Sequence, residues 1–447
     1  MLPSRSSSLQ ILLPLEKRRV AWTTMRLTLA LAAIFPFSAA AQERDTTELQ
    51  QLQEQVEAIT RELEELRLGR DLVVEADTSA YGFGPAASKV YQVRQGVSIG
   101  GYGEVLYENF ADSREDDTPS GATDRLDALR GIVYVGYKFS DKVLFNSEVE
   151  FEHGSTGEGG SVSLEFAYLE YRISPRFGLR GGLLLPPMGF INEIHEPPAF
   201  LGARRPETER QIIPSTWREN GIGFFGSAGD FAYRAYLVNG FDATGFAASG
   251  IRGGRQNGAE ASAENFGTVG RVDYTGVPGL AVGTSAYLGN SGQGAVLPSD
   301  PTRSIGARTF IWEGHAQYKH AGFDLSGLIA LSTLEDAAEI NELNNLAAEA
   351  TVGERLVGWY LQGGYDVLRR SRTGHQLIPY IRYEQLNTQD EVPVGFTADP
   401  TNDRRLISIG AMWKPLLNVS LKADYQITST EAETGVNQLN VNLGYLF

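Results

Sequence analysis

The feature that most constrains this chain is an alternation of apolar and polar side chains with a period of two residues. In the last segment, every second residue from Leu439 to Phe447 is apolar, and every second residue from Gln438 to Gly444 is polar or small. Successive side chains of a strand point to opposite faces of the sheet. The pattern therefore predicts a strand with one apolar face and one polar face.

Sixteen segments of this kind follow one another along the chain. Their apolar faces carry Trp and Tyr toward the segment ends, as the aromatic girdles of transmembrane barrels require. The segments span residues 96–110, 126–139, 142–153, 161–173, 176–186, 219–228, 231–241, 265–275, 280–290, 308–319, 322–332, 353–367, 375–386, 403–414, 418–428 and 436–447.

The connectors between these segments alternate in length. Short ones span residues 140–141, 174–175, 229–230, 276–279, 320–321, 368–374 and 415–417, and long ones span 111–125, 187–218, 242–264, 291–307, 333–352 and 387–402. Short turns at one end and long loops at the other are typical of outer-membrane barrels. A soluble sandwich also alternates, but 447 residues are too many for one sandwich. We predict an all-β fold, a 16-stranded antiparallel transmembrane β-barrel over residues 96–447, with a short N-terminal α-helical coiled coil.

The N-terminus resembles an export signal. From Met25 the chain reads MRLTLALAAIFPFSAAAQ, in which Arg26 precedes an apolar core and the small residues 39–41 precede Gln42. These are the parts of a secretory signal peptide, predicted over residues 1–41, with Met25 as an alternative start of translation. The apolar core is too short for a stable membrane span, so an anchor helix is the less favoured alternative.

A heptad repeat occupies residues 46–70. Its apolar seam, spaced alternately three and four residues apart, consists of Leu49, Leu52, Val56, Ile59, Leu63 and Leu66. This spacing predicts a coiled-coil stalk in the periplasm that joins several chains, most simply as a homotrimer. The alternative is a single amphipathic helix that lies on another surface. Residues 71–95 are expected to form a linker.

Few residues point to catalysis. The chain contains no Cys, which excludes disulfides, thiolate metal sites and Cys nucleophiles. Its formal net charge of −16 argues against nucleic acid as a partner. The pair His195-Glu196 lacks the second His of a zinc-protease helix, and Pro197-Pro198 would break such a helix. We expect no enzymatic activity, no cofactor and no metal.

The connector of residues 187–218, third on its side of the barrel after 111–125 and 154–160, is the longest and the richest in Pro and charge. It also contains apolar residues, among them Phe190, Ile191 and Trp217. Long loops of this content are usually functional, so we expect it to fold into the barrel. Charges fixed at a narrowing of a pore set its ion selectivity, although the same charges could pair and brace the loop. The candidate constriction residues are Arg204, Arg205, Arg210, Arg218, Glu193 and Glu196.

Strand alternation points further charges into the lumen. The basic candidates are Lys138, Arg172, Arg180, Arg271 and Arg382, and acidic residues share these faces. Mixed signs predict a hydrated pore wall. The terminal Phe447 is the expected signal for the barrel-assembly machinery.

The export signal, the coiled coil, the opening strand VSIGGYGEVLY (97–107), the sixteen segments and the terminal Phe resemble the phosphate-selective porin O/P family. So does the stretch LPPMGFINEIHEPPAFLGARRPETERQIIPSTWRENGIGFFG. The resemblance implies a trimeric channel whose third loop folds inward, and it assigns the constriction to the four arginines of that loop. Phosphate specificity is not implied: without residues 1–41, 34 basic residues face 54 acidic ones, and Lys is scarce.

The sequence therefore predicts an outer-membrane porin. Small hydrophilic solutes or ions, including anions such as phosphate, would diffuse through a lumen narrowed by residues 187–218. The alternative is a structural anchor in the outer membrane, tethered to the periplasm or cell wall through the coiled coil. Expected partners are outer-membrane lipid, further copies of the chain, the barrel-assembly machinery and the solutes.

Overall fold

The computed structural model describes residues 54–60, 79–154, 157 and 159–447. The predicted signal peptide (1–41), most of the coiled coil (46–70) and residues 71–78 of the expected linker lie outside the described residues. Residues 54–60 are helical. They belong to a unit, Met1–Glu64, that is separate from the unit Glu65–Phe447.

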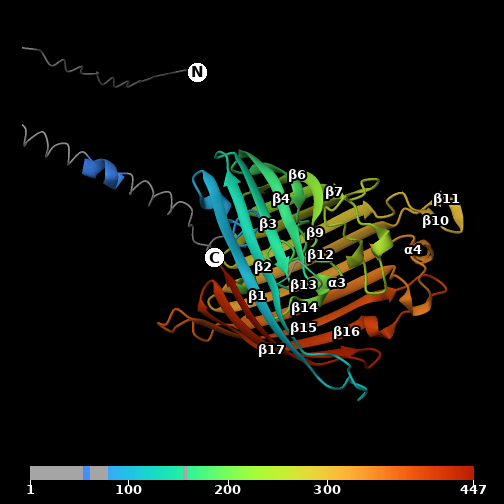
Figure 1. The fold of residues 1–447 in the computed structure, drawn as a ribbon. Coiled ribbons are helices and arrows are strands. Elements are labelled where there is room, and N and C mark those ends of the chain that lie inside the picture. The colour runs from blue at the N-terminus through green and yellow to red at the C-terminus, as the bar shows by residue number, and fades with distance from the viewer. Residues whose placement is uncertain (1–53, 61–78, 155–156, 158) are drawn as a thin grey trace, which may run out of the picture. The chain divides into compact units, whose positions relative to one another are not determined.

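Sixteen strands close into an antiparallel barrel, which confirms the predicted fold class (Figure 1). Around the wall the order is β1-β18-β17-β16-β15-β14-β13-β12-β9-β8-β7-β6-β5-β4-β3-β2. The strands are β1 (Gly96–Phe110), β2 (Arg125–Lys138), β3 (Val143–Glu152), β4 (Ser161–Ser174), β5 (Phe177–Leu184), β6 (Glu219–Ala228), β7 (Phe231–Asn239), β8 (Phe266–Val277), β9 (Leu280–Asn290), β12 (Arg308–His320), β13 (Phe323–Leu334), β14 (Arg355–Tyr365), β15 (Gln376–Glu391), β16 (Asp403–Leu416), β17 (Val419–Thr430) and β18 (Gln438–Leu446).

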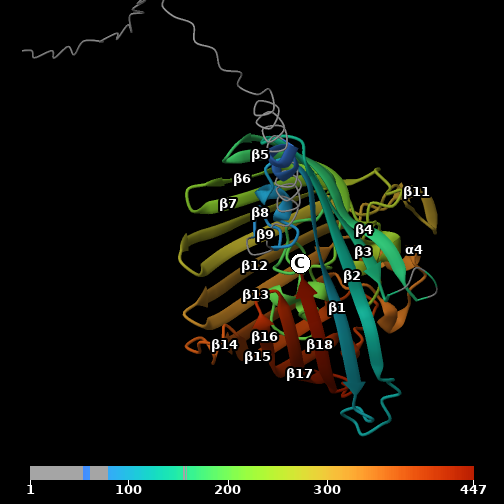
Figure 2. The ribbon, with the colours of Figure 1, turned by 60° about the vertical axis from the view of Figure 1, so that its left-hand side comes forward.

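The barrel closes between its first and last strands (Figure 2). In this seam Tyr102 pairs with Leu446 and Phe110 pairs with Gln438. The terminal residue extends the seam, because the Phe447 N–H donates to the Gly101 carbonyl at 2.9 Å and the Gly101 N–H donates back at 3.0 Å.

The alternation of side chains sorts the wall into two faces. In β18 the outward Leu443 is 39% exposed, whereas the inward Asn440 and Asn442 are fully buried. Most strand bounds agree with the prediction to within two or three residues, and β15 runs five residues further than expected. Among the described residues, no helix is long and apolar enough to cross a membrane.

The long loops carry the remaining elements. The connection between β9 and β12 contains the hairpin β10 (Val296–Leu297) and β11 (Asp300–Ser304), which lies with α4 (Ala337–Leu343) at the end opposite the chain's C-terminus (Figure 1). Short 3₁₀ turns are η1 (Pro197–Ala199), η2 (Ala243–Gly245), η3 (Arg252–Gly254), η4 (Ala348–Ala350) and η5 (Pro400–Asn402).

The segment between β5 and β6, residues 185–218 and called loop 3 below, lies inside the barrel. It contains η1 and the helix α3 (Glu207–Gln211), whose contacts are with β14 and β15. Its apolar side chains are buried: the Trp217 ring stacks on Phe241 with centroids 4.6 Å apart and meets the edge of Tyr287 at 5.0 Å. The apolar content of the loop is therefore used to fix it to the inner wall.

The residues before the first strand also enter the barrel. Residues 79–95, expected to be part of a linker, contain α2 (Lys89–Gln92) and bury Phe83, Ala86 and Ala87. They join an apolar cluster to which the wall contributes inward aromatic rings such as Tyr134 and Phe166. This part of the interior is a packed core, because apolar side chains on the inner face of β2–β4 find partners there.

Candidate functional site

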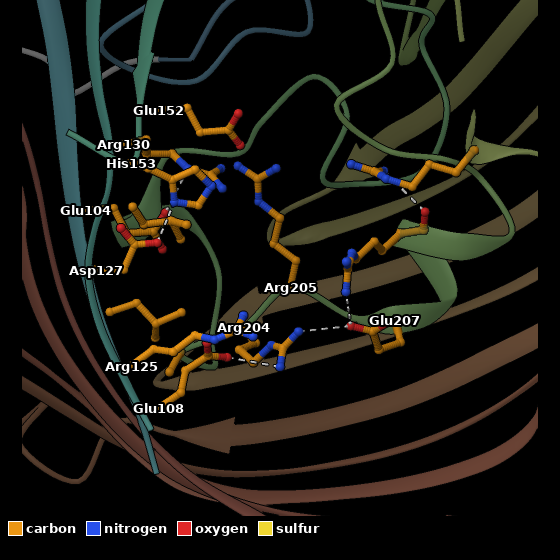
Figure 3. Close-up of a pocket in the computed structure, with 15 residues that line it drawn as sticks. Glu104, Glu108, Arg125, Asp127, Arg130, Glu152, His153, Arg204, Arg205 and Glu207 are labelled. Atoms are coloured by element: carbon orange, nitrogen blue, oxygen red, sulfur yellow. Dashed lines mark hydrogen bonds and ion pairs between the residues drawn. The ribbon is translucent and has the colours of Figure 1, made fainter. Parts of the chain in front are cut away.

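Two adjoining cavities lie between loop 3 and the strands β1–β4 (Figure 3). They have volumes of about 290 and 440 Å³, and their lining includes residues of the long loops, such as His153, Arg252 and Asn257. Both are lined by Arg130, Glu152, Arg205, Arg210 and Arg252. We refer to this pair of cavities as the vestibule.

The strand side of the vestibule is acidic. Glu104 and Glu108 come from β1, Glu150 and Glu152 from β3, and Glu165 from β4. Strand alternation places each pair on the inner face. The β2 residue Arg130 lies among them, with its Nε 3.3 Å from Glu104 and 3.9 Å from Glu150.

Loop 3 contributes the four arginines that the sequence singled out, and three of them pair with carboxylates. Arg204 lies 3.1 Å from Glu108 and 3.5 Å from Glu207, as Figure 3 shows. Arg210 lies 3.0 Å from the same Glu207, and Arg218 pairs with Glu165 on β4. These contacts brace the loop against the wall and against itself.

The fourth, Arg205, is different. Its side chain extends into the middle of the pocket in Figure 3 without a marked partner, and its Nη2 atom has no hydrogen bond within the described part of the chain. Burial, and next the charge of Arg130, lower its pKa. The guanidinium therefore lies near Arg130 and near the carboxylates Glu104 and Glu150, with its buried Nη2 atom left without a hydrogen bond among the described residues.

Two further arginines come from the loop between β7 and β8, and the sequence analysis did not select them. Arg252 donates to the carbonyl of Ser215 and to Thr216 Oγ1 (3.0 Å), and Arg255 donates to the carbonyl of Thr216 at 2.7 Å. Among the described residues, neither guanidinium lies within 4 Å of a carboxylate. Burial and then neighbouring arginines lower the pKa of Arg252 to about 9 and that of Arg255 to about 10.

A signal for these two residues was present in the sequence. The stretch IRGGRQNG places two arginines three residues apart in a glycine-rich loop. Nothing in the spacing indicates that η3 turns both side chains toward loop 3, because that depends on contacts between two loops distant in sequence.

The far wall holds loop 3 in position. The N–H of Ala203 donates to Asp424 at 2.6 Å, Lys422 Nζ donates to the Gly202 carbonyl at 2.9 Å, and Arg382 donates to the Arg204 carbonyl at 3.3 Å. Charged side chains of β15 and β17 thus form hydrogen bonds with the loop 3 backbone at residues 202–204. These bonds hold the backbone that carries Arg204 and Arg205 on the side opposite the vestibule.

Glu193 and Glu196 lie elsewhere. Neither lines the vestibule, although both are in loop 3. Glu193 lies 3.3 Å from Arg234, and Glu196 accepts hydrogen bonds from the backbone of Ala86 and Ala87. The structure therefore separates these two carboxylates from the arginines with which the sequence grouped them.

The remaining lumen candidates are all engaged in the interior. Lys138 donates to the carbonyl of Val93, and Arg382 lies beside Glu384. Arg172 and Arg180 both lie beside Glu170, at 3.9 and 3.0 Å, and Arg271 pairs with Asp273 at 2.8 Å. Within the described residues no cluster of His, Asp and Glu could hold a metal ion.

Comparison with known proteins finds a relative by sequence and solved structures with the same fold. The chain is 40% identical over 355 residues to an uncharacterized protein of Aquifex aeolicus (strain VF5), a match that covers 77% of this chain and 78% of that protein. No family model matches the chain.

Two solved structures share the barrel at low sequence identity. The outer membrane channel DcaP of Acinetobacter baumannii matches with a TM-score of 0.51 and 12% identity over 78% of this chain and 97% of that one. A loop-deletion mutant of OmpT, an outer membrane protein of Vibrio cholerae, matches with a TM-score of 0.50 and 14% identity over 79% of this chain and 100% of that one. The fold is thus that of known outer-membrane barrels.

Proposed function

Since the chain belongs to one family with the Aquifex aeolicus protein and has the fold of outer-membrane barrels, we propose that it is an outer-membrane channel. Small hydrophilic solutes diffuse through it passively, and it performs no chemistry on them. A homotrimer is the proposed assembly.

The polarity of the wall supports a place in the membrane. Outward side chains such as Leu439, Val441 and Tyr445 are exposed around a closed barrel. An apolar belt of this size is unusual on a water-soluble monomer. A closed barrel also pairs the backbone groups of the wall without leaving a free sheet edge, as a bilayer requires.

The path of loop 3 supports a constriction. Arg204 and Arg205 line the vestibule, whereas Pro198 and Ala199 line a cavity of about 420 Å³ on the side of the short turns. On this proposal, a solute that crosses the barrel passes the stretch between them. Loop 3 at residues 198–205 is therefore the proposed narrowing.

The observation that carries selectivity is a group of vestibule guanidiniums that form no ion pair with a carboxylate of the described residues, among them Arg205, Arg252 and Arg255. A guanidinium binds carboxylate or phosphate groups through paired hydrogen bonds. We therefore infer that the channel favours anions even though the chain is acidic; many carboxylates, such as Asp116 and Asp117, lie exposed on the outer loops. Phosphate is one such anion, although the resemblance to the phosphate-selective porin O/P family does not imply specificity for it.

Planar-bilayer recording of the purified, folded protein tests the proposal. We expect stepwise current and, in a salt gradient, a reversal potential that indicates anion preference. Replacement of Arg205, Arg252 and Arg255 by Gln should shift the reversal potential toward cation preference. The matched control is Arg303→Gln, because Arg303 lies exposed on an outer loop beside Glu339.

Two outcomes would contradict the proposal. If the wild-type protein passes no current, the channel is refuted, and the structural anchor becomes the better explanation. If the triple variant keeps the wild-type reversal potential, these arginines do not select the ion.

A further inference from the structure

Residues 81–93, called the strap below, lie in the barrel interior against loop 3 on one side and the wall on the other. Phe83 stacks on Tyr168 with ring centroids 5.5 Å apart, and Ala86 and Val90 are each 1% exposed. The strap follows the chain's N-terminal residues directly. It therefore connects whatever precedes it to the inside of the barrel.

The contact with loop 3 is made by the two carboxylates that do not line the vestibule. Glu196 Oε1 accepts hydrogen bonds from the backbone N–H groups of Ala86 (3.0 Å) and Ala87 (3.2 Å). A methyl group added at Gly84 would lie 2.5 Å from the Glu196 carboxyl carbon, and one at Gly82 would lie 2.6 Å from Glu193 Oε1. A methyl group at either glycine would therefore displace the carboxyl group that it meets from its present position.

The wall holds the strap from the other side. Asn146 Nδ2 donates to the Ala87 carbonyl at 3.0 Å, and Lys138 Nζ donates to the Val93 carbonyl at 2.8 Å. Tyr91 donates its hydroxyl to Glu170 at 2.8 Å. The strap is therefore seated in a site built from β2, β3 and β4 together with loop 3.

The same stretch of loop 3 leads to the narrowing. Glu196 is followed at once by Pro197 and Pro198, which open η1, and then by the residues up to Arg205. Proline fixes the backbone φ angle, so a shift at Glu196 is carried along the chain more readily than through a flexible loop. Without the strap, the buried Glu196 carboxylate would lose both of its backbone donors, which is costly in a buried site.

We propose that the strap is an intramolecular lock that holds loop 3 in its narrow position, and that its withdrawal toward the periplasm widens the pore. The proposal rests on the proposed channel function. Because the strap is covalently continuous with the N-terminal part of the chain, tension on that part is the natural way to release it.

The test uses the full-length protein and the absence of Cys from the native sequence. Ala87→Cys introduces a single thiol at a position that is 3% exposed, so a charged thiol reagent reports when the strap leaves its site. We expect slow labelling in this background. Adding Glu196→Ala should speed labelling about tenfold or more, because two buried amide donors lose their acceptor, and should raise the single-channel conductance.

Two further variants separate the contact from general damage. Gly84→Ala disturbs the same contact from the strap side and should reproduce the effect of Glu196→Ala. Glu196→Gln keeps an acceptor oxygen and should stay near wild type. The matched control is Gly131→Ala, because a methyl group there meets no atom within 4 Å.

The outcomes distinguish the two proposals. The strap proposal is overturned if the wild-type protein conducts but Glu196→Ala and Gly84→Ala leave the labelling rate and the conductance unchanged. Faster labelling with unchanged conductance also overturns it, since the strap would then move without moving loop 3. Absence of current in the wild-type protein overturns the channel itself, while the labelling rates still show whether Glu196 holds the strap.

Discussion

Arg180 on β5 offers the sharpest test of how the barrel interior is held together. Its guanidinium lies 3.0 Å from Glu170, donates to the Tyr236 hydroxyl at 2.9 Å, and stacks over the rings of Phe83 and Tyr168 at 4.8 and 4.6 Å. It is 2% exposed. One side chain therefore joins β4, β5, β7 and the strap.

The loss of stability expected on replacing Arg180 follows from these contacts. In Arg180→Met an apolar side chain takes the place of the guanidinium. The carboxylate of Glu170 then stays buried without its nearer cation, and only Arg172 remains, 3.9 Å away. Breaking a buried ion pair in this way costs about 3–5 kcal/mol. The lost stacking on the rings of Phe83, Tyr168 and Phe225 adds about 1 kcal/mol. We expect the free energy of unfolding to fall by about 4–6 kcal/mol in total.

The assay is urea unfolding of the folded protein in lipid vesicles, followed by Trp fluorescence, because Trp217 is fully buried in the interior. Adding Glu170→Gln to Arg180→Met removes the unpaired charge and should recover half of the loss or more. The control Arg303→Met breaks an exposed pair and should cost at most about 1 kcal/mol. If the double variant is no more stable than Arg180→Met, the unpaired charge is not the cause of the loss.

Three further predictions concern other parts of the chain. Burial raises the pKa of Glu196 to about 8, so the stability that its protonated form contributes is full below the unfolded pKa and is lost as the pH rises through 8. In urea titrations at pH 5 to 9, Glu196→Gln should flatten this dependence of the free energy of unfolding on pH. If the slope persists in Glu196→Gln, Glu196 is not its cause. Removal of Phe447 deletes its two backbone bonds to Gly101 and should lower the yield of folded, heat-modifiable barrel, against a Phe447→Tyr control. Val56 and Ile59 are more than half exposed in the single chain, so other copies of the helix could cover them in a trimer. The double variant Val56→Asn, Ile59→Asn should therefore convert a trimer to monomers in analytical ultracentrifugation. An unchanged mass would refute the coiled-coil contact.

The strands could be predicted because their signal is local. A transmembrane wall needs one face suited to lipid, so each segment shows the two-residue alternation of apolar and polar side chains, as in Leu439 to Phe447. The closure of β1 on β18 then follows from an even strand number and from the amphipathic last segment.

The occupation of the lumen was harder to predict. Segment 126–139 carries Ile132 and Tyr134 on its inner face, opposite the outward Val133 and Val135. Apolar residues on both faces indicate that another segment covers the inner face of this strand, but they do not identify that segment. The structure shows that it is the strap, residues that composition alone assigns to a linker.

The candidate site, too, could be predicted only in part from the sequence. The four arginines of loop 3 could be selected by residue type and by their place in an unusual loop. Their nearby partner Glu207 lies three residues from both Arg204 and Arg210. The other partners could not be selected, because Glu108, Glu165, Asp424 and Arg252 lie in strands and loops far away in sequence.

What the sequence determined by itself is therefore the wall, its polarity and the identity of the loop that enters it, since each depends on neighbours along the chain. Only the tertiary structure decided which charges are compensated. It pairs Arg204, Arg210 and Arg218 with carboxylates, gives Arg205 no such pair among the described residues, and turns Glu193 and Glu196 away from the vestibule. Charge compensation depends on distances of a few ångströms between segments that meet only after the barrel closes.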